Sequence, residues 1–227
     1  MNTVHFNPQA ADMSDHQDDD VTDTTGVRAS TPAAKARRSR RIFDAVVQLA
    51  EEGGVDAVRA RAICDRAGVS MGTLYRTFDS IEEILLSAFQ DDFDELEHQL
   101  RSIATEGGTR QARLDRLFGF MTNRLMAREG YARAVISAMA SGHHKAAELI
   151  GSINARLVEM IHGALVGRVE PLPVLGASAE RSPQHMAAGI LRLVWFSMLI
   201  GWANDLYSRD DVLNEMHGTA NLLVQAL

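Results

Sequence analysis

The spacing of apolar residues along the chain predicts helices throughout. One stripe repeats at intervals of four, three and one positions, as one face of a helix requires; its members are Ile42, Val46, Leu49 and Ala50. No segment alternates apolar and polar residues as a half-buried strand would. We therefore expect an all-α fold. Turn-forming glycines divide it into about nine helices, at residues 34–52, 59–67, 71–77, 81–101, 110–128, 131–140, 145–166, 184–207 and 210–226.

Charge is distributed unevenly along the chain. The 227 residues carry 23 Lys and Arg against 30 Asp and Glu, a formal net charge of −7. Residues 1–27 hold six Asp and no Lys or Arg, residues 28–76 hold ten Lys and Arg against five Asp and Glu, and residues 77–227 hold thirteen against nineteen. A module of charge +5 therefore lies between two acidic segments, and this local charge favours nucleic-acid binding despite the whole-chain value.

Cysteine content and hydropathy indicate a cytoplasmic protein. Cys64 is the single cysteine, so no intramolecular disulfide is possible, and an inert core thiol is a more natural role for it than a redox switch. The first residues are acidic and polar, so we expect no secretory signal. The apolar stretch 186–204 is interrupted by Arg192 and followed by Asp205, which favours a buried helix and no membrane partner.

The segment 67–78, AGVSMGTLYRTF, has the features of a helix-turn-helix motif. Gly68 suits the left-handed position of a tight turn, and Ser70 suits the cap of a short helix whose first residues would meet base edges. Leu74 and Phe78, four residues apart, should pack back into the module's core. The residues expected to contact DNA are Lys35, Arg37, Arg38, Arg41, Arg59, Arg61, Ser70, Met71, Gly72, Thr73, Tyr75, Arg76 and Thr77.

Gly72 stands inside this short helix, where glycine costs about 1 kcal/mol relative to alanine. A bare position there would let the helix lie flush against a duplex. Glycine turns between short helices also occur in helical proteins that bind no DNA, and the basic run at 35–41 alternatively forms a solvated face. Their presence together in one basic module favours DNA binding.

Residues 40–90 closely resemble the N-terminal domain of the TetR family of bacterial transcriptional regulators. The most specific part is AGVSMGTLYRTFDS followed by an amphipathic helix. The resemblance implies a homodimer that binds a palindromic operator as a repressor and releases it when a small molecule enters the C-terminal domain. Thr77 stands where the family usually has an aromatic residue or histidine, and Ile81 where it usually has lysine.

A narrower likeness concerns the effector. The pattern around DAVRARAICDRA, together with NRLM at 123–126 and VWFSMLIGW at 194–202, is similar to KstR-like repressors of sterol and lipid catabolism. This implies a steroid or lipid acyl-CoA as the effector, with an efflux-type regulator of a multidrug or xenobiotic response as the alternative. Methionine-rich helices suit an apolar guest, although each methionine alone is more simply a core residue. The expected ligand-binding residues are Phe118, Met121, Leu125, Met126, Ile136, Met139, Met160, Trp195, Met198 and Trp202.

The last two helices carry long apolar stripes that face either their own core or a second subunit. The resemblance implies a four-helix dimer interface there. The stripes are Leu191, Trp195, Leu199, Trp202 and Leu206, and Leu213, Met216, Ala220, Leu223 and Leu227.

Together these observations predict that the chain consists of three parts. Residues 1–33 lack apolar periodicity and should form a disordered acidic tail, residues 34–80 the helix-turn-helix DNA-binding domain, and residues 81–227 the ligand-binding and dimerisation domain.

Other function classes are less well supported. The sequence holds no H-E-x-x-H or phosphate-loop motif and no second cysteine, so we expect no enzyme and no cofactor. His143 and His144 are adjacent, and Glu159 and His162 are three apart, but no third ligand is visible and no metal site is expected. A protein-interaction adaptor with a vestigial DNA-binding domain remains a further alternative.

Overall fold

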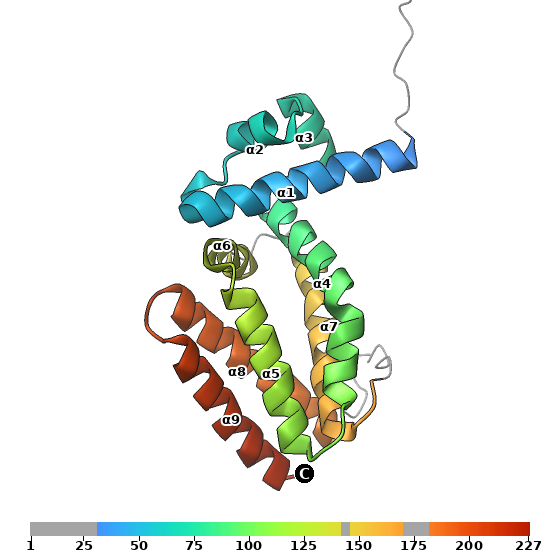
Figure 1. The fold of residues 1–227 in the computed structure, drawn as a ribbon, viewed down its shortest axis with the longest axis vertical. Helices are drawn as coiled ribbons and strands as arrows, with labels where there is room; N and C mark the ends of the chain where they lie inside the picture. Colours follow the sequence, from blue (N-terminus) through green and yellow to red (C-terminus); the bar gives the residue numbers. More distant parts are fainter. Residues whose placement is uncertain (1–30, 142–145, 170–181) are drawn as a thin grey trace, which may run out of the picture.

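The computed structural model describes residues 31–141, 146–169 and 182–227. Over these residues the chain forms nine α-helices and no strand, which confirms the all-α expectation (Figure 1). Residues 1–30 of the expected tail (1–33), His143 and His144, and most of the proline-containing loop before residue 184 lie outside the described residues. The end of the expected tail is wrong, because Thr31 caps a helix that already begins at Pro32. The helices are α1 (Pro32–Ala57), α2 (Ala60–Ala67), α3 (Met71–Thr77), α4 (Ile81–Thr105), α5 (Arg110–Met126), α6 (Glu129–Ala140), α7 (Ala147–Val166), α8 (Pro183–Ala203) and α9 (Arg209–Gln225).

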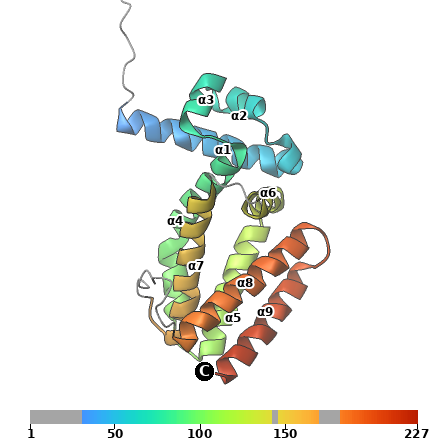
Figure 2. The same ribbon diagram turned by 180° about the vertical axis from the view of Figure 1, so that it is seen from behind.

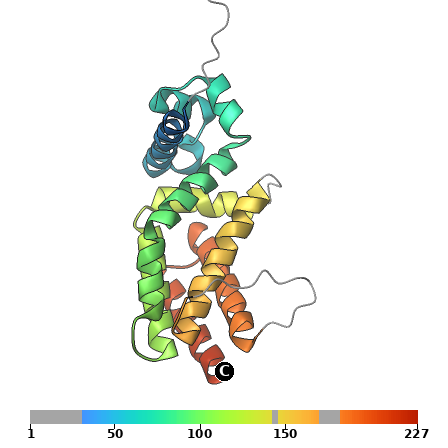
Figure 3. The same ribbon diagram turned by 90° about the vertical axis from the view of Figure 1, so that its right-hand side faces the viewer.

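The helices divide into a head, α1–α3, and a body, α4–α9. In Figure 1 α2 and α3 lie on the side of α1 that faces away from the body, and α4 descends from α1 beside α7. Seen from behind and from the side, α4 is again the long helix that reaches from the head into the body (Figures 2 and 3). On the opposite side of the body, α8 and α9 pack against each other.

Local chemistry sets most helix ends. Ser70 and Ser80 cap α3 and α4, each accepting a hydrogen bond of 3.1 Å from the backbone N–H three residues on. α1 leaves helical geometry at Gly53 and Gly54, as expected, but a further helical turn carries it to Ala57. α8 ends four residues earlier than expected, because the chain turns at Asp205, whose φ is +58°.

Two hydrophobic cores meet along α4 and α6. The core of the head contains Ile42, Ile63 and Leu74, and it continues into the first turns of α4 and into Tyr131 of α6. Phe93 and later residues of α4 belong instead to the core of the body. The expected boundary at residue 80 thus separates two helices that share one core.

α6 lies in close backbone contact with α1 at Gly130. A Cβ placed on Gly130 would lie 2.1 Å from the carbonyl oxygen of Ala50, so a side chain at this position would force the two helices apart. The body is therefore held against the head by backbone packing as well as by the shared core.

The two apolar stripes of α8 and α9 face inward within one chain. Leu191, Trp195, Leu199 and Trp202 are buried in the body, and only Leu206 of the first stripe is exposed. In the second stripe Met216 and Ala220 are buried too. α8 is apolar on several sides, so its periodicity did not reveal which side faces its own core. Exposed apolar side chains on these two helices are Met186, Ile190, Leu193 and Leu222.

α7 and α8 are long and apolar enough to cross a membrane by length and composition, with mean hydropathies of 1.2 and 1.6. In each, 39% of the apolar window is buried inside the structure. One or two such helices are weak evidence for a membrane protein, because a core helix of a soluble protein passes the same test.

Candidate nucleic-acid interface and apolar cavity

α3 divides its residues between the head's core and solvent. Leu74 and Phe78 are buried, as expected, at 1% and 8% exposure. Met71 and Tyr75 are 42% and 54% exposed although both are large, and Arg76 is exposed beside them. A helix of seven residues therefore presents an aromatic hydroxyl and a guanidinium on its outer face.

Hydrogen bonds within α3 hold this outer face in place. The Ser70 hydroxyl accepts from the Thr73 N–H, and the Arg76 guanidinium donates to the Thr73 hydroxyl at 3.2 Å. The Thr77 hydroxyl donates to the Thr73 carbonyl at 2.9 Å, so it is engaged inside the helix. Ile81, at the other departure from the family pattern, packs against the head's core.

Gly72 has no structural requirement within the chain itself. A Cβ there would meet only the Arg76 guanidinium, at 3.5 Å, which is ordinary contact. Gly68, in contrast, adopts φ +63° at the end of α2 and needs the freedom of glycine. Docking against a duplex therefore stays a prediction for Gly72.

The basic residues of the head fall into two groups. Arg40 pairs with Asp91 and Glu95 of α4, and Arg66 pairs with Glu52 of α1. Within the described part of the chain, no carboxylate lies within ion-pair distance of the remaining cations. These are Lys35, Arg37, Arg38, Arg41, Arg59, Arg61 and Arg76, all among the residues expected to contact DNA.

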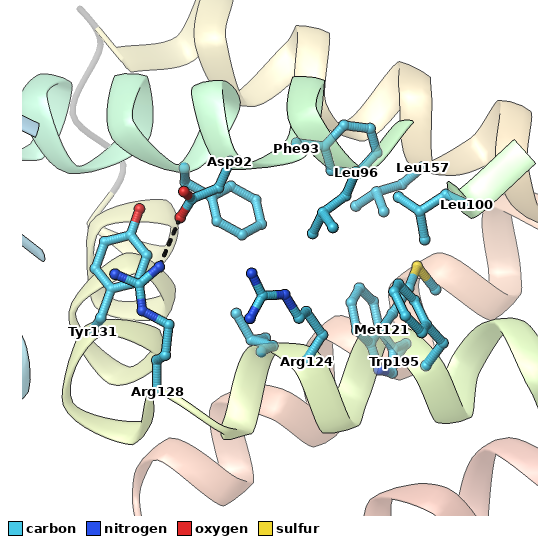
Figure 4. Close-up of a pocket in the computed structure, with 13 residues that line it drawn as sticks. Asp92, Phe93, Leu96, Leu100, Met121, Arg124, Arg128, Tyr131, Leu157 and Trp195 are labelled. Carbon is cyan, nitrogen blue, oxygen red and sulfur yellow. Dashed lines mark hydrogen bonds and ion pairs between the residues drawn. The ribbon is translucent and has the colours of Figure 1, made fainter. Parts of the chain in front are cut away.

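A mainly apolar cavity lies in the body between α4, α5, α7 and α8 (Figure 4). About 620 Å³ of space in and around it is not filled by protein atoms, and this figure includes open solvent. Its apolar walls include Phe89, Phe93, Leu96, Leu100, Phe120, Met121, Leu125, Leu157 and Trp195. The polar residues that line it are Asp92, Arg124, Arg128 and Tyr131.

The cavity includes some of the expected ligand-binding residues. Met121, Leu125 and Trp195 line it, while Ile136 and Met139 line a smaller adjoining cavity that shares Leu125 and Trp195. The other five expected residues line neither of these two cavities; they are Phe118, Met126, Met160, Met198 and Trp202.

Sequence reasoning missed the α4 wall and the polar residues. The apolar positions Phe89, Phe93, Leu96 and Leu100 on α4 were the available signal, but nothing in their spacing says that they face α5. On the opposite wall, the indole N–H of Trp195 donates to the buried hydroxyl of Thr122 at 2.9 Å, which fixes the ring's orientation.

The polar residues form a link between the cavity and the head. Arg128 pairs with Asp92 of α4 at 3.2 Å and with Glu51 of α1, and its guanidinium lies 4.8 Å from the centre of the Tyr131 ring. Burial raises the pKa of Asp92, and burial together with the charge of Asp92 raises the pKa of Tyr131. The Tyr131 hydroxyl is buried beside Asp92.

Other candidate chemistry is absent from the described residues. In residues 31–141, 146–169 and 182–227, no three His, Cys, Asp or Glu side chains gather as a metal site would require. Cys64 is buried, and burial raises the pKa of its thiol, which disfavours the reactive thiolate.

Comparison with known proteins places the chain among bacterial regulators. Residues 42–88 match the family model described as bacterial regulatory proteins, tetR family. The chain is similar to the HTH-type transcriptional repressor KstR of Mycobacterium tuberculosis, at 31% identity over 84% of this chain and 82% of that protein. It is equally similar to KstR of Mycolicibacterium smegmatis, at 31% identity over 84% and 89%.

Solved structures show the same fold. A TetR transcriptional regulator from Rhodococcus sp. RHA1 superposes with a TM-score of 0.68 at 20% identity, covering 83% of this chain and 96% of that chain. Thermus thermophilus FadR, in complex with lauroyl-CoA, gives a TM-score of 0.61 at 22% identity over 83% and 94%. At these identities the structures establish the fold alone.

Proposed function

Because the chain belongs to the tetR family of bacterial regulatory proteins and is therefore a transcriptional regulator, we propose a specific mechanism for it. It binds a palindromic operator as a homodimer and releases it when a small apolar effector enters the cavity of the body. The observation that carries this proposal is that α4 connects two sites. Its first turns belong to the core of the head, which presents α3 and the unpaired cations, and its later turns line the apolar cavity.

DNA contact is proposed for two parts of the head. Tyr75 and Arg76 project from α3, where they can reach base edges or phosphates in the major groove. The unpaired cations of α1, such as Arg38 and Arg41, precede α3 in the sequence and supply phosphate contacts. Ser70 and Thr73 order the N-terminus of α3, which favours a phosphate oxygen.

Release follows from the position of α4. Its first half packs in the head and its second half lines the cavity, so a guest that displaces Phe93 or Leu96 also shifts the base of the head. In a dimer this changes the separation of the two α3 helices, which must be about 34–36 Å to fit successive major grooves. A convincing switch requires the effector to prefer the released state by several kcal/mol.

The effector class is proposed from the cavity and the relatives. The walls are mostly aliphatic and aromatic, which suits a steroid or an acyl chain. Similarity to KstR repressors, and a fold shared with a FadR that binds lauroyl-CoA, supports a lipid or its CoA thioester.

Dimerisation is proposed through α8 and α9. Met186, Ile190 and Leu193 lie at intervals of four and three on α8 and are 51%, 45% and 57% exposed, and Leu222 on α9 is 70% exposed. Such an exposed apolar stripe supports a four-helix interface between two chains. A DNA-binding regulator of this kind acts in the cytoplasm.

The experiment that tests the proposal is a titration of the purified chain with its own upstream DNA, followed by fluorescence anisotropy. We expect specific binding with a steep negative salt dependence, two chains per operator by sedimentation, and release by lauroyl-CoA or a steroid thioester. Equal affinity for a scrambled duplex at physiological salt would contradict it.

A further inference from the structure

We propose that the acidic segment of this chain, residues 12–23, binds the unpaired cations of the head and competes there with DNA. The inference rests on the proposed function, because it concerns how that DNA-binding surface is regulated. It begins from the first turns of α1, where most of the positive charge meets no carboxylate of the described chain.

The first turns of α1 carry positive charge only. Five cations stand within seven residues, with no Asp or Glu among them: Lys35, Arg37, Arg38, Arg40 and Arg41. Arg41 follows Arg38 by three residues and Arg37 by four, so like charges are neighbours on the helix surface and repel each other. The positive end of the helix dipole adds to this repulsion, because the first turn holds no acidic residue. A bound anion would therefore stabilise this end of α1.

Packing does not hold this end of α1 in place. None of residues 31–41 is buried, and the first buried residue of the helix is Ile42. Figures 1 and 2 show these turns projecting past α2 and α3 at one end of the head. Of the five cations, only Arg40 meets carboxylates in the described part of the chain, those of Asp91 and Glu95. The other four are available to an anion.

The cations of α1 extend as far as the turn that leads into α3. A nitrogen of the Arg41 guanidinium lies 3.8 Å from the position that a Cβ would take on Gly68. Arg76 is exposed on α3, beyond that turn. An anion that follows α1 therefore covers the surface to which DNA binding is assigned.

The sequence supplies such an anion directly before α1. Residues 1–27 hold six Asp and no Lys or Arg, and all six stand between positions 12 and 23. Three of them are consecutive, at positions 18–20, so their negative charges follow one another closely, as the phosphates of DNA do. This segment lies outside the described residues. Its charge of −6 is opposite in sign to the surface that follows it in the same chain.

The connection to α1 is long enough for the segment to reach this surface. Residues 24–31 separate Asp23 from the helix, and a chain of that length spans up to about 29 Å when fully extended. From Pro32 to Arg41 the helix rises by about 14 Å. Because the segment and the head belong to one chain, their encounter is intramolecular, and even weak ion pairs then compete with DNA.

The competition has a characteristic dependence on salt. DNA must displace the segment, so affinity is reduced most at low salt, where the ion pairs of the segment are strongest. The same factor applies to every duplex, whereas base contacts are added only by an operator. The segment therefore suppresses binding to unrelated DNA by charge alone.

Two triple variants of the full-length chain with the same change in net charge test this competition. One neutralises three Asp of the segment, and the other neutralises three exposed acidic residues of the body. They are Asp18→Asn/Asp19→Asn/Asp20→Asn and Glu106→Gln/Glu148→Gln/Asp210→Asn. By fluorescence anisotropy, the segment variant should bind unrelated duplex about 5- to 10-fold more tightly than the parent at about 50 mM salt, and less than about 2-fold more tightly at about 200 mM. The body variant should stay within about 2-fold of the parent at both.

Zero-length cross-linking shows where the segment binds. A carbodiimide joins a carboxylate to a lysine amine, and the chain has lysine only at positions 35 and 145. Arg76→Lys adds a lysine on α3 and Arg110→Lys adds one in the body, each without a change in charge. Mass spectrometry should find the segment joined to position 76 and not to position 110. An excess of duplex DNA should abolish the link.

Equal DNA affinity of the segment variant and the parent, or equal gains in the two triple variants, would overturn the inference. A gain confined to the segment variant, but without a link to position 76, would overturn it too, because the segment would then repel DNA without binding the head. The parent's preference for operator over a scrambled duplex, measured in the same titrations, decides the proposed function separately. The cross-link forms without DNA, so binding of the segment to the head is decided even where that preference fails.

Discussion

The arginines of the head and those of the body differ in what they face. Among the described residues, at least half of the body arginines pair with a carboxylate, and several of these ion pairs join one helix to another. In the head, across the described residues, seven cations face no carboxylate, and only Arg40 and Arg66 are paired. Body arginines with a carboxylate partner include Arg101, Arg116, Arg128, Arg133 and Arg156.

This difference separates cations that hold the fold from cations that await a partner. A paired arginine contributes modestly to stability and fixes the position of a helix, whereas an unpaired one leaves its full charge for a ligand. The criterion can be tested in the head.

The largest effect is expected from the double variant Tyr75→Ala/Arg76→Ala. Both residues are exposed, so the thermal unfolding followed by circular dichroism should not change. Operator affinity should fall about 100-fold or more, since each lost base or phosphate contact costs about 1–3 kcal/mol. Arg110→Ala, in the body, is the matched control and should bind normally. Equal binding by the double variant and the parent would remove α3 from the interface.

An effect on stability is expected at the junction of head and body. Gly130→Ala places a methyl group against the Ala50 carbonyl and should lower the free energy of unfolding by about 1–3 kcal/mol. Gly119→Ala, inside α5 with nothing within 4 Å, should raise it by up to about 1 kcal/mol. Urea midpoints at an unchanged m-value measure both. Similar midpoints for the two variants would show that α6 does not press on α1 in solution.

The smallest effect distinguishes paired from unpaired cations within α1. Arg38→Gln should reduce the slope of log affinity against log salt by about 1, as loss of one phosphate contact requires. Arg40→Gln removes the same charge from an arginine that already faces Asp91 and Glu95, and should change the slope clearly less. A slope that falls equally in both variants would show that pairing does not decide DNA contact.

Prediction from sequence succeeded where interactions are local. The bounds of α3, the Ser70 and Ser80 caps and the burial of Leu74 and Phe78 agree with expectation, because each depends on residues about four positions apart. The side of α8 that faces inward could not be predicted: Trp195 and Leu199 face the chain's own core, which is one of the two alternatives left open, because a helix that is apolar on several sides gives no sign of which side is inside.

The sequence by itself determined the nine helices over the described residues, their caps and the chemistry available to α3. The tertiary structure alone decided which charges are neutralised and where the cavity opens. Arg128 meets Asp92 and Glu51 across 36 and 77 residues of sequence, and no local pattern indicates either contact. Helical periodicity reports the face a residue occupies, whereas the partner it meets depends on how the helices pack.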